Sequence, residues 1–241
     1  MKLVLKISGE VLKLDNLEKN KEELGNFIEK LVKENHQVAI IIGGGNLFRG
    51  REHLNMDELN RDTIGMLASL MNAFHIQDEL SKNSIKSIIS CPFNLNNLIP
   101  SYSNDRLREL YQNTVLIFGG GLGKTGISTD TKCFEVAKLL DVDTIIKLSN
   151  VKGIYDKDPK TNNDAKLLTK VTYDEVLENN LKIFDLGVLE ACKLNNIKIR
   201  VLDYKDKNDI FKEIGALVSA QEKFAQEFTT WIQENEDNQN K

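Results

Sequence analysis

Ile40-Ile41-Ile42-Gly43-Gly44-Gly45-Asn46-Leu47-Phe48-Arg49-Gly50 is the most informative segment of this chain. An apolar run that is typical of a buried strand passes directly into three glycines and then into an arginine. Glycine lacks a Cβ, so the chain can turn sharply and bring several backbone N–H groups close to an anion, while arginine offers a planar fork of donors to phosphate oxygens. A plain strand-to-helix turn is the alternative, because glycine turns are common. Two further loops help to decide between these interpretations.

The second loop, Lys6-Ile7-Ser8-Gly9-Glu10, follows the apolar residues Leu3-Val4-Leu5 near the N-terminus. A lysine at a strand end, beside a Ser-Gly turn, can place a compact ammonium group next to the oxygens of a transferring phosphate. An exposed lysine on a terminal strand is the alternative, since lysines are mostly exposed. Together with the first loop, this one favours phosphate binding.

The third glycine loop covers residues 119–130. Its Gly123-Lys124-Thr125 matches the end of a P-loop, but the position five residues before Gly123, where a P-loop requires glycine, is Phe118. The strand-like residues 144–146 end in Lys147 and not in the aspartate that holds magnesium in P-loop proteins. The sequence therefore disfavours a P-loop.

Length and composition suit a single α/β enzyme domain, because 241 residues with 41% hydrophobic content can bury one large core. Lys and Arg total 32 against 36 Asp and Glu, a formal net charge of −4, and no basic run suggests a nucleic-acid partner. Cys91, Cys133 and Cys192 are isolated, so we expect reduced thiols and neither a disulfide framework nor a zinc site. No run of about 18 apolar residues suggests a membrane span, and a cytoplasmic protein is expected.

Predicted strands and helices alternate along the chain. Strands are expected at residues 3–5, 38–42, 85–89, 114–118, 143–147 and 197–202, and helices at residues 24–32, 66–74, 105–111, 128–140 and 185–194 and after residue 208. This alternation is typical of a parallel sheet covered by helices on both faces. Residues 156–166 are polar and predict a loop, and Thr172-Tyr173-Asp174-Glu175 predicts a capping box at the start of a further helix.

Apolar side chains recur at helical spacing within residues 66–74. They predict one buried face of this helix, in which the methionines fill the core. The residues of this predicted face are Met66, Leu67, Leu70, Met71 and Phe74.

The three glycine loops all follow predicted parallel strands, so they are expected to meet. In open parallel sheets, ligands bind outside the carboxyl ends of the strands. Three loops offer more donors than the phosphates of one nucleotide need, which favours a donor and an acceptor phosphate lying end to end. Such a phosphoryl transfer depends on positioning and charge stabilisation, and needs no Ser-His-Asp constellation. We expect Lys6, Arg49 and Asp130 to lie around a common pair of phosphoryl groups.

These loops and several further motifs resemble the bacterial UMP kinases, the uridylate kinases of the amino acid kinase superfamily. The resemblance covers about residues 1–218, with the motifs in the same order. The motifs are Lys6-Ile7-Ser8-Gly9-Glu10, Gly43-Gly44-Gly45-Asn46-Leu47-Phe48-Arg49-Gly50, Asp62 with Gly65-Met66-Leu67-Ala68 and Met71-Asn72, Ser128-Thr129-Asp130, and Val151-Lys152-Gly153-Ile154-Tyr155-Asp156-Lys157-Asp158-Pro159.

The resemblance implies a three-layer αβα sandwich with a mainly parallel central sheet over residues 1–218. The chain continues beyond the usual family ending, and residues 219–241 predict a C-terminal helical extension and polar tail. It implies transfer of the ATP γ-phosphate to UMP, giving UDP and ADP for pyrimidine nucleotide biosynthesis. Mg²⁺ would be bound with ATP, without a separate metal site in the protein. ATP and UMP would be the small-molecule partners of a homo-oligomer, a hexamer by resemblance, with no nucleic-acid or membrane partner.

The resemblance also implies roles for individual residues. Catalysis would use Lys6, Arg49 and Asp130, with Asp130 orienting Lys6 and not acting as a base, because a phosphate nucleophile is already ionised. The ATP-binding residues would be Lys6, Ile7, Ser8, Gly9, Gly45, Arg49, Ser149, Asn150, Tyr155 and Asp158. The UMP-binding residues would be Gly44, Asp62, Leu122, Gly123, Lys124, Thr125, Gly126, Ile127, Ser128 and Thr129. Asp62 would accept hydrogen bonds from the ribose hydroxyls.

The third loop departs from the family pattern. Where the relatives usually have Thr-Gly-Asn-Pro-Phe-Phe-Thr-Thr-Asp, residues 122–130 lack the proline and the aromatic pair, so uracil must be contacted differently. A helix N-cap is the alternative role for Asp130. Two alternative functions also remain: a related kinase that acts on a carboxylate or carbamate, and a noncatalytic nucleotide sensor. Asp62 favours UMP over the first, and the presence of Lys6, Arg49 and Asp130 favours catalysis over the second.

Overall fold

The computed structural model describes residues 1–95, 98–149, 153–157, 159, 161–168, 171–181 and 183–203. These residues all belong to the first of two compact units, Met1–Asp203. Asn150, Asp158, the helix expected after residue 208 and the extension expected at residues 219–241 lie outside the described residues.

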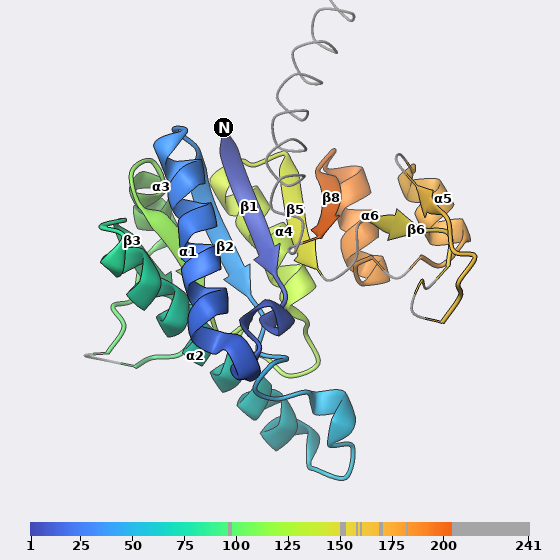
Figure 1. Ribbon diagram of the computed structural model, residues 1–241, viewed down its shortest axis with the longest axis horizontal. Helices are drawn as coiled ribbons and strands as arrows, with labels where there is room; N and C mark the ends of the chain where they lie inside the picture. The colour runs from blue at the N-terminus through green and yellow to red at the C-terminus, as the bar shows by residue number, and fades with distance from the viewer. Residues whose placement is uncertain are drawn as a thin grey trace, which may run out of the picture. The chain divides into compact units, whose positions relative to one another are not determined.

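Six parallel strands form the central sheet of the described residues (Figure 1). Their order across the sheet is β3 (Ser87–Ser90), β4 (Val115–Phe118), β2 (Gln37–Ile42), β1 (Lys2–Ile7), β5 (Thr144–Ser149) and β8 (Lys198–Asp203). Every neighbouring pair in this order is parallel, which confirms the predicted mainly parallel sheet. The carboxyl ends of the strands therefore share one edge, and the three glycine loops leave β1, β2 and β4 at that edge.

Helices pack on both faces of this sheet, which confirms the three-layer αβα architecture (Figure 1). On one face, α1 (Leu17–Lys33) and α2 (Glu58–Lys82) pack against each other and against β2. On the other face, α3 (Asn104–Tyr111) packs against β4, and α4 (Thr129–Leu140) packs against β1, β2 and β5. Next to α4 lies α6 (Leu186–Leu194), which contacts it directly. The short helix α5 (Tyr173–Glu178) contacts α6 in turn.

Shorter elements complete the described part of the chain. A two-stranded antiparallel sheet pairs β6 (Ile154–Tyr155) with β7 (Leu167–Leu168). The described residues between these strands, 156–157, 159 and 161–166, belong to no helix or strand, as the predicted loop requires. The sequence analysis did not predict this sheet, because strands of two residues carry no measurable periodicity. Two 3₁₀ helices, η1 (Gly9–Leu12) and η2 (Leu14–Asn16), follow β1. A third, η3 (Gly50–Glu52), follows the glycine loop after β2.

The central strands are buried on both faces, as a parallel sheet covered by two helical layers requires. Leu3, Val4 and Leu5 of β1 have no exposed surface. Successive side chains of a strand point to opposite faces, and Val4 belongs to the cluster that contains Cys133 of α4. Lys6 lies two residues beyond Val4, so its side chain points to the same face, toward α4.

Hydrogen-bonded caps mark two of the predicted helix starts. At α5, the hydroxyl of Thr172 accepts from the Glu175 N–H, and the Glu175 carboxylate accepts from the Thr172 N–H, which confirms the predicted capping box. At α4, the N-cap is Ser128, whose hydroxyl accepts from the Asp130 N–H. Asp130 lies inside the first helical turn, so the alternative role of Asp130 as the N-cap is wrong.

The predicted buried face of α2 is wrong for three of its five residues. Leu67, Met71 and Phe74 are 46%, 54% and 43% exposed, whereas Leu70 is buried as predicted. Apolar residues occur all around this helix, so periodicity alone does not select the face that packs. The face that packs carries small side chains such as Ala73, which let the helix approach the glycine loops closely: a Cβ added at Gly119 would lie 2.9 Å from the Ala73 Cβ.

The three cysteines are free thiols, with Cys133 and Cys192 buried and Cys91 partly buried. No helix in the described part of the chain combines the length and the apolar character needed to cross a membrane.

Candidate active site

The first and second glycine loops contact each other at the carboxyl edge of the sheet. The Gly43 N–H donates to the Ile7 carbonyl at 3.0 Å. A Cβ added at Gly9 would lie 2.6 Å from the Gly45 nitrogen and 2.7 Å from the Gly43 oxygen, which is closer than real Cβ atoms approach backbone. Only glycine allows the two loops to meet this closely, and both present backbone groups to the same region.

Two asparagines hold the second loop in place. Asn72 of α2 has no exposed surface, and its side-chain amide donates to the Gly43 carbonyl and to the Asn46 side chain, both at 2.7 Å. Asn46 donates in turn to the Leu12 carbonyl at 2.6 Å, at the end of η1. The sequence analysis gave neither asparagine a role. A polar amide among apolar helix positions is the signal that could have identified Asn72.

The third loop is anchored on α2. The Gly120 N–H donates to the Ser69 hydroxyl at 2.7 Å, and the Gly126 N–H donates to the Asp62 carboxylate at 2.6 Å. The structure thus joins the predicted ribose acceptor to the predicted UMP loop. Four glycines of this loop have positive φ, namely Gly120, Gly121, Gly123 and Gly126. Residues 123–127, among them Lys124, Thr125 and Ile127, are exposed, while Leu122 and Ser128 are partly buried.

The third loop is not a P-loop. In that motif, the lysine and the following Ser or Thr open the helix that follows the strand. Here, α4 begins at Thr129, four residues beyond Thr125. Both the missing glycine at Phe118 and the late helix start therefore exclude the phosphate-wrapping geometry of a P-loop.

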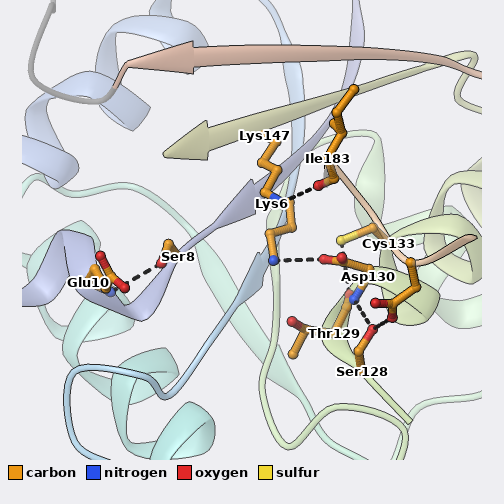
Figure 2. Close-up of polar contacts among 10 residues, drawn as sticks. Lys6, Ser8, Glu10, Ser128, Thr129, Asp130, Cys133, Lys147 and Ile183 are labelled. Atoms are coloured by element: carbon orange, nitrogen blue, oxygen red, sulfur yellow. Dashed lines mark hydrogen bonds and ion pairs between the residues drawn. The ribbon is translucent and has the colours of Figure 1, made fainter. Parts of the chain in front are cut away.

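A buried ion pair joins β1 to α4 at the same edge of the sheet. The Lys6 Nζ lies 2.8 Å from the Asp130 Oδ1, and the two side chains are only 11% and 13% exposed (Figure 2). Burial opposes the charged form of Lys6, but the negative charge of Asp130 and the hydrogen bond to it outweigh burial, so the pKa of Lys6 is raised. The ammonium group is therefore fully charged at neutral pH and held at a fixed position.

Two residues beside this pair were missed by the sequence analysis as parts of the site. Lys147 lies opposite Lys6 in the sheet, and it donates to the Ile183 carbonyl (Figure 2). Its Nζ lies 4.8 Å from the centre of the Phe184 ring. The pKa of Lys147 is lowered mainly by burial and, to a smaller extent, by the nearby positive charge of Lys6. Asp185 accepts a hydrogen bond from the Ser128 hydroxyl, and so connects the start of α6 to the start of α4. Charges at strand and helix ends are the signal that could have identified both.

Arg49 lies in the second loop, where two groups hold its guanidinium. Its Nε donates to the Gly45 carbonyl at 2.9 Å, and its Nη2 donates to the Glu10 carboxylate at 2.7 Å. A third contact, from Nε to the exposed Glu52, is longer at 3.7 Å. The arginine is therefore tied to both glycine loops.

The remaining predicted nucleotide-binding residues lie on several elements. Ile7 is the buried last residue of β1, Ser8 caps η1, and the Gly44 carbonyl accepts from the N–H groups of the second loop. Ser149 is the last residue of β5, at the same edge, and Tyr155 lies on β6. The contacts of Gly44 with UMP and of the other residues with ATP, like those expected of Asn150 and Asp158, stay predictions.

The described residues contain no group of three or more His, Cys, Asp or Glu side chains that could hold a metal ion.

The fold and this site define a class of protein that binds phosphate groups at the carboxyl edge of a parallel sheet without a P-loop. Sequence comparison makes the class specific: the model of the amino acid kinase family matches residues 1–203, and the chain belongs to that family.

Curated relatives and solved structures agree with this assignment. The uridylate kinase of Wigglesworthia glossinidia brevipalpis is 34% identical, over 90% of this chain and 96% of the relative. The uridylate kinase of Mycoplasmopsis pulmonis is 36% identical, over 88% of this chain and 92% of the relative. The structure of UMP kinase from Ureaplasma parvum matches with a TM-score of 0.82 and 28% identity, over 88% of this chain and 95% of that one.

Proposed function

We propose that this protein transfers the γ-phosphoryl group of ATP to UMP and forms ADP and UDP. The observation that carries this proposal is the buried Lys6–Asp130 pair, which lies at the sheet edge from which all three glycine loops start. The uridylate kinases and UMP kinases to which the chain is similar supply the identity of the acceptor.

Donor binding falls to the first two loops. The backbone N–H groups around Ser8, Gly9 and Gly45 would hold the phosphates of ATP, with the Arg49 guanidinium beside them. Phosphoryl transfer has little covalent chemistry for a protein to perform, so positioning and charge stabilisation account for most of the catalysis. Lys6 would stabilise the charge that builds up on the transferring group, because its ammonium is fixed in place before the substrates bind.

Asp130 would act on Lys6 and not on the acceptor. A phosphate oxygen of UMP is already ionised, so the reaction does not need a general base. The Asp130 carboxylate is bonded to the Lys6 ammonium and raises the pKa of Lys6. Its role would be to keep that ammonium charged and correctly oriented.

Acceptor binding falls to Asp62 and the third loop. A carboxylate offers two oxygens with about four acceptor sites, so the bond from Gly126 leaves capacity for the ribose hydroxyls. Gly44 would face the UMP phosphate. Without the proline and aromatic pair of its relatives, the loop at residues 122–129 would contact uracil through its backbone.

A divalent metal ion fits this site as a partner of ATP. Mg²⁺ keeps several water molecules and binds through substrate phosphates and one or two carboxylates, so it requires no cage of protein ligands. Asp185, which is exposed and close enough to Lys6 to affect the pKa of Lys6, would be the side chain placed to contribute an oxygen. The ion would neutralise charge on the β- and γ-phosphates.

A homo-oligomer would cover the exposed apolar stripe of α2. The stripe consists of Ile64, Leu67, Met71 and Phe74, which are all at least 37% exposed. Their spacing of three, four and three residues is symmetric, so in an antiparallel pair of α2 helices Ile64 would face Phe74 and Leu67 would face Met71. A second copy of the chain is therefore the partner that this stripe fits. The hexamer and the cytoplasmic location stay predictions.

An acceptor panel tests the proposed reaction. Purified protein with ATP and Mg²⁺ is expected to form ADP in proportion to added UMP, and much more slowly with CMP, acetylglutamate or aspartate. Lys6→Met serves as the inactive control. Faster ADP formation with a carboxylate acceptor than with UMP would show that the protein is a related kinase that acts on carboxylates. No response to any acceptor at millimolar concentration would favour a nucleotide sensor.

A further inference from the structure

Glu10 forms the shortest ion pair of the Arg49 guanidinium, although the sequence analysis gave Glu10 no role in the site. The distance from the Glu10 Oε1 to the Arg49 Nη2 is 2.7 Å, and the two side chains are only 25% and 29% exposed. The two residues are 39 positions apart and come from the first and second glycine loops. The ion pair therefore joins the two loops that we expect to hold the donor phosphates.

The contacts of Arg49 restrict the plane of its guanidinium. Nε donates to the Gly45 carbonyl and Nη2 donates to Glu10, so two different nitrogens of the group are held. A guanidinium carries five N–H donors, so these two bonds leave three for a ligand. A group that is already oriented loses less conformational freedom on binding than a mobile side chain does. The contact with Glu10 thus orients the remaining N–H donors of Arg49 in a defined direction.

The backbone of Glu10 is itself fixed by the first loop. Ser8 caps η1 by accepting from the Glu10 N–H at 3.4 Å (Figure 2). The Val11 N–H donates to the Ser8 carbonyl at 3.0 Å. The same turn contains Gly9, which contacts the second loop closely. The position of the Glu10 carboxylate therefore depends on the loop that would surround ATP.

We propose that Glu10 is a positioning residue, which holds the Arg49 guanidinium in the orientation required to bind the donor phosphates during transfer. This inference rests on the proposed function. The reasoning is geometric: a displacement of about 1 Å in a group that stabilises a transition state can reduce the rate about 100-fold. Glu10 would act through Arg49 and would not touch the substrates.

A purely electrostatic role of Glu10 makes the opposite prediction. A carboxylate next to a phosphate site repels the phosphates and neutralises part of the arginine's charge. If that were its main effect, removing the negative charge would strengthen ATP binding. The sign of the change therefore separates orientation from charge neutralisation.

The experiment compares Glu10→Ala and Glu10→Gln with a matched control, Glu52→Gln, whose carboxylate makes the longer contact with the same arginine at 3.7 Å. Turnover, KM for ATP, KM for UMP and the ATP dissociation constant are measured for each variant. Glu10→Ala is expected to lower turnover about 10- to 100-fold and to weaken ATP binding, with KM for UMP within about twofold of the wild-type value. Glu10→Gln keeps an oxygen acceptor and is expected to recover most of the loss. Glu52→Gln is expected to match the wild type.

A second variant pair shows whether Glu10 acts through Arg49. In an Arg49→Lys background, which keeps the positive charge but lacks the fork, Glu10→Ala is expected to cause no further loss. An equal loss in both backgrounds would overturn the proposal, as would tighter ATP binding by Glu10→Ala or Glu10→Gln. Thermal unfolding of each variant identifies any that fail to fold, in which case Glu10→Gln supplies the comparison.

Wild-type protein is measured first, so that the two proposals can fail separately. If none of the tested acceptors causes the wild-type protein to form ADP, the proposed function fails. The ATP dissociation constants then still decide the role of Glu10, because a positioning residue for Arg49 must weaken ATP binding when it is removed.

Discussion

Replacing Asp130 with asparagine is expected to lower both stability and turnover, because it leaves the Lys6 ammonium buried without its charged partner. Asparagine has nearly the same shape as aspartate, so packing against β1 is preserved. Removing one partner of a buried ion pair costs about 3–5 kcal/mol. The asparagine oxygen still accepts one hydrogen bond and the negative charge of Asp185 remains close to Lys6, so about 3 kcal/mol is expected here. For a protein of this size, that corresponds to a fall in Tm of about 6–12 °C.

The pH dependence follows from the pKa of Lys6. In the wild type this pKa is raised above the ordinary value of 10.5, so the stabilisation from charged Lys6 is complete below pH 10.5 and is lost only as the pH rises through the raised value. Without Asp130, burial, which is already the largest single influence, is no longer outweighed, so the pKa of Lys6 is expected to fall. The stability difference between wild type and Asp130→Asn should therefore be constant below the lowered pKa of the variant. It should shrink as the pH rises through that value and then through the raised pKa of the wild type, and the alkaline loss of turnover should begin at lower pH in the variant.

The assay is thermal and denaturant unfolding of wild type, Asp130→Asn, Lys6→Met and the double variant, with turnover measured in parallel. The double variant removes both charges. Its loss in free energy of unfolding is therefore expected to be smaller than the sum of the two single losses by at least about 2 kcal/mol. Lys6→Met is expected to lower turnover about 10²- to 10³-fold. Asp141→Asn is the control, because its pair with Lys2 is 3.6 Å long and the Asp141 side chain is fully exposed. Additive single losses, or an equal loss for the control, would refute the reasoning.

Two further predictions concern backbone contact and assembly. Gly9→Ala is expected to raise KM for ATP about tenfold or more, because its Cβ would lie 2.6 Å from the Gly45 nitrogen and displace both loops; steady-state kinetics test this against Gly187→Ala, whose Cβ would meet nothing within 4 Å. Met71→Glu is expected to dissociate the homo-oligomer while circular dichroism stays unchanged, because it places a charge on the apolar stripe of α2; an unchanged molar mass by light scattering would show that α2 is not an interface.

Local sequence patterns predicted most of the secondary structure. Apolar runs identified the central strands within a few residues, for example 38–42 against Gln37–Ile42 for β2. Helical periodicity and the Thr172–Glu175 capping box identified the helices, with α3, α4 and α6 within one residue of the predicted bounds. The helices α1 (Leu17–Lys33 against 24–32) and α2 (Glu58–Lys82 against 66–74) extend well beyond the predicted segments. The alternation of strands and helices predicted the parallel arrangement, which places the three glycine loops at one edge of the sheet.

The errors and omissions have a common cause. The buried face of α2 was wrong because its apolar residues surround the helix, and the choice of face depends on which side chains are small enough to pack beside the glycine loops. Asn72 and Lys147 were missed because each acquires its role through a partner on another element. Such partners depend on strand order and register, which local periodicity does not contain.

Patterns among neighbouring residues indicated which segments form the central strands and the longer helices, which loops are rich in glycine, and which cations and carboxylates those loops carry. The packing of the whole domain brings Glu10 to Arg49 and Ser128 to Asp185, and it turns an apolar stripe of α2 outward. These features require residues far apart in the chain to come within hydrogen-bonding or packing distance, and that proximity is set by how the layers pack as a whole.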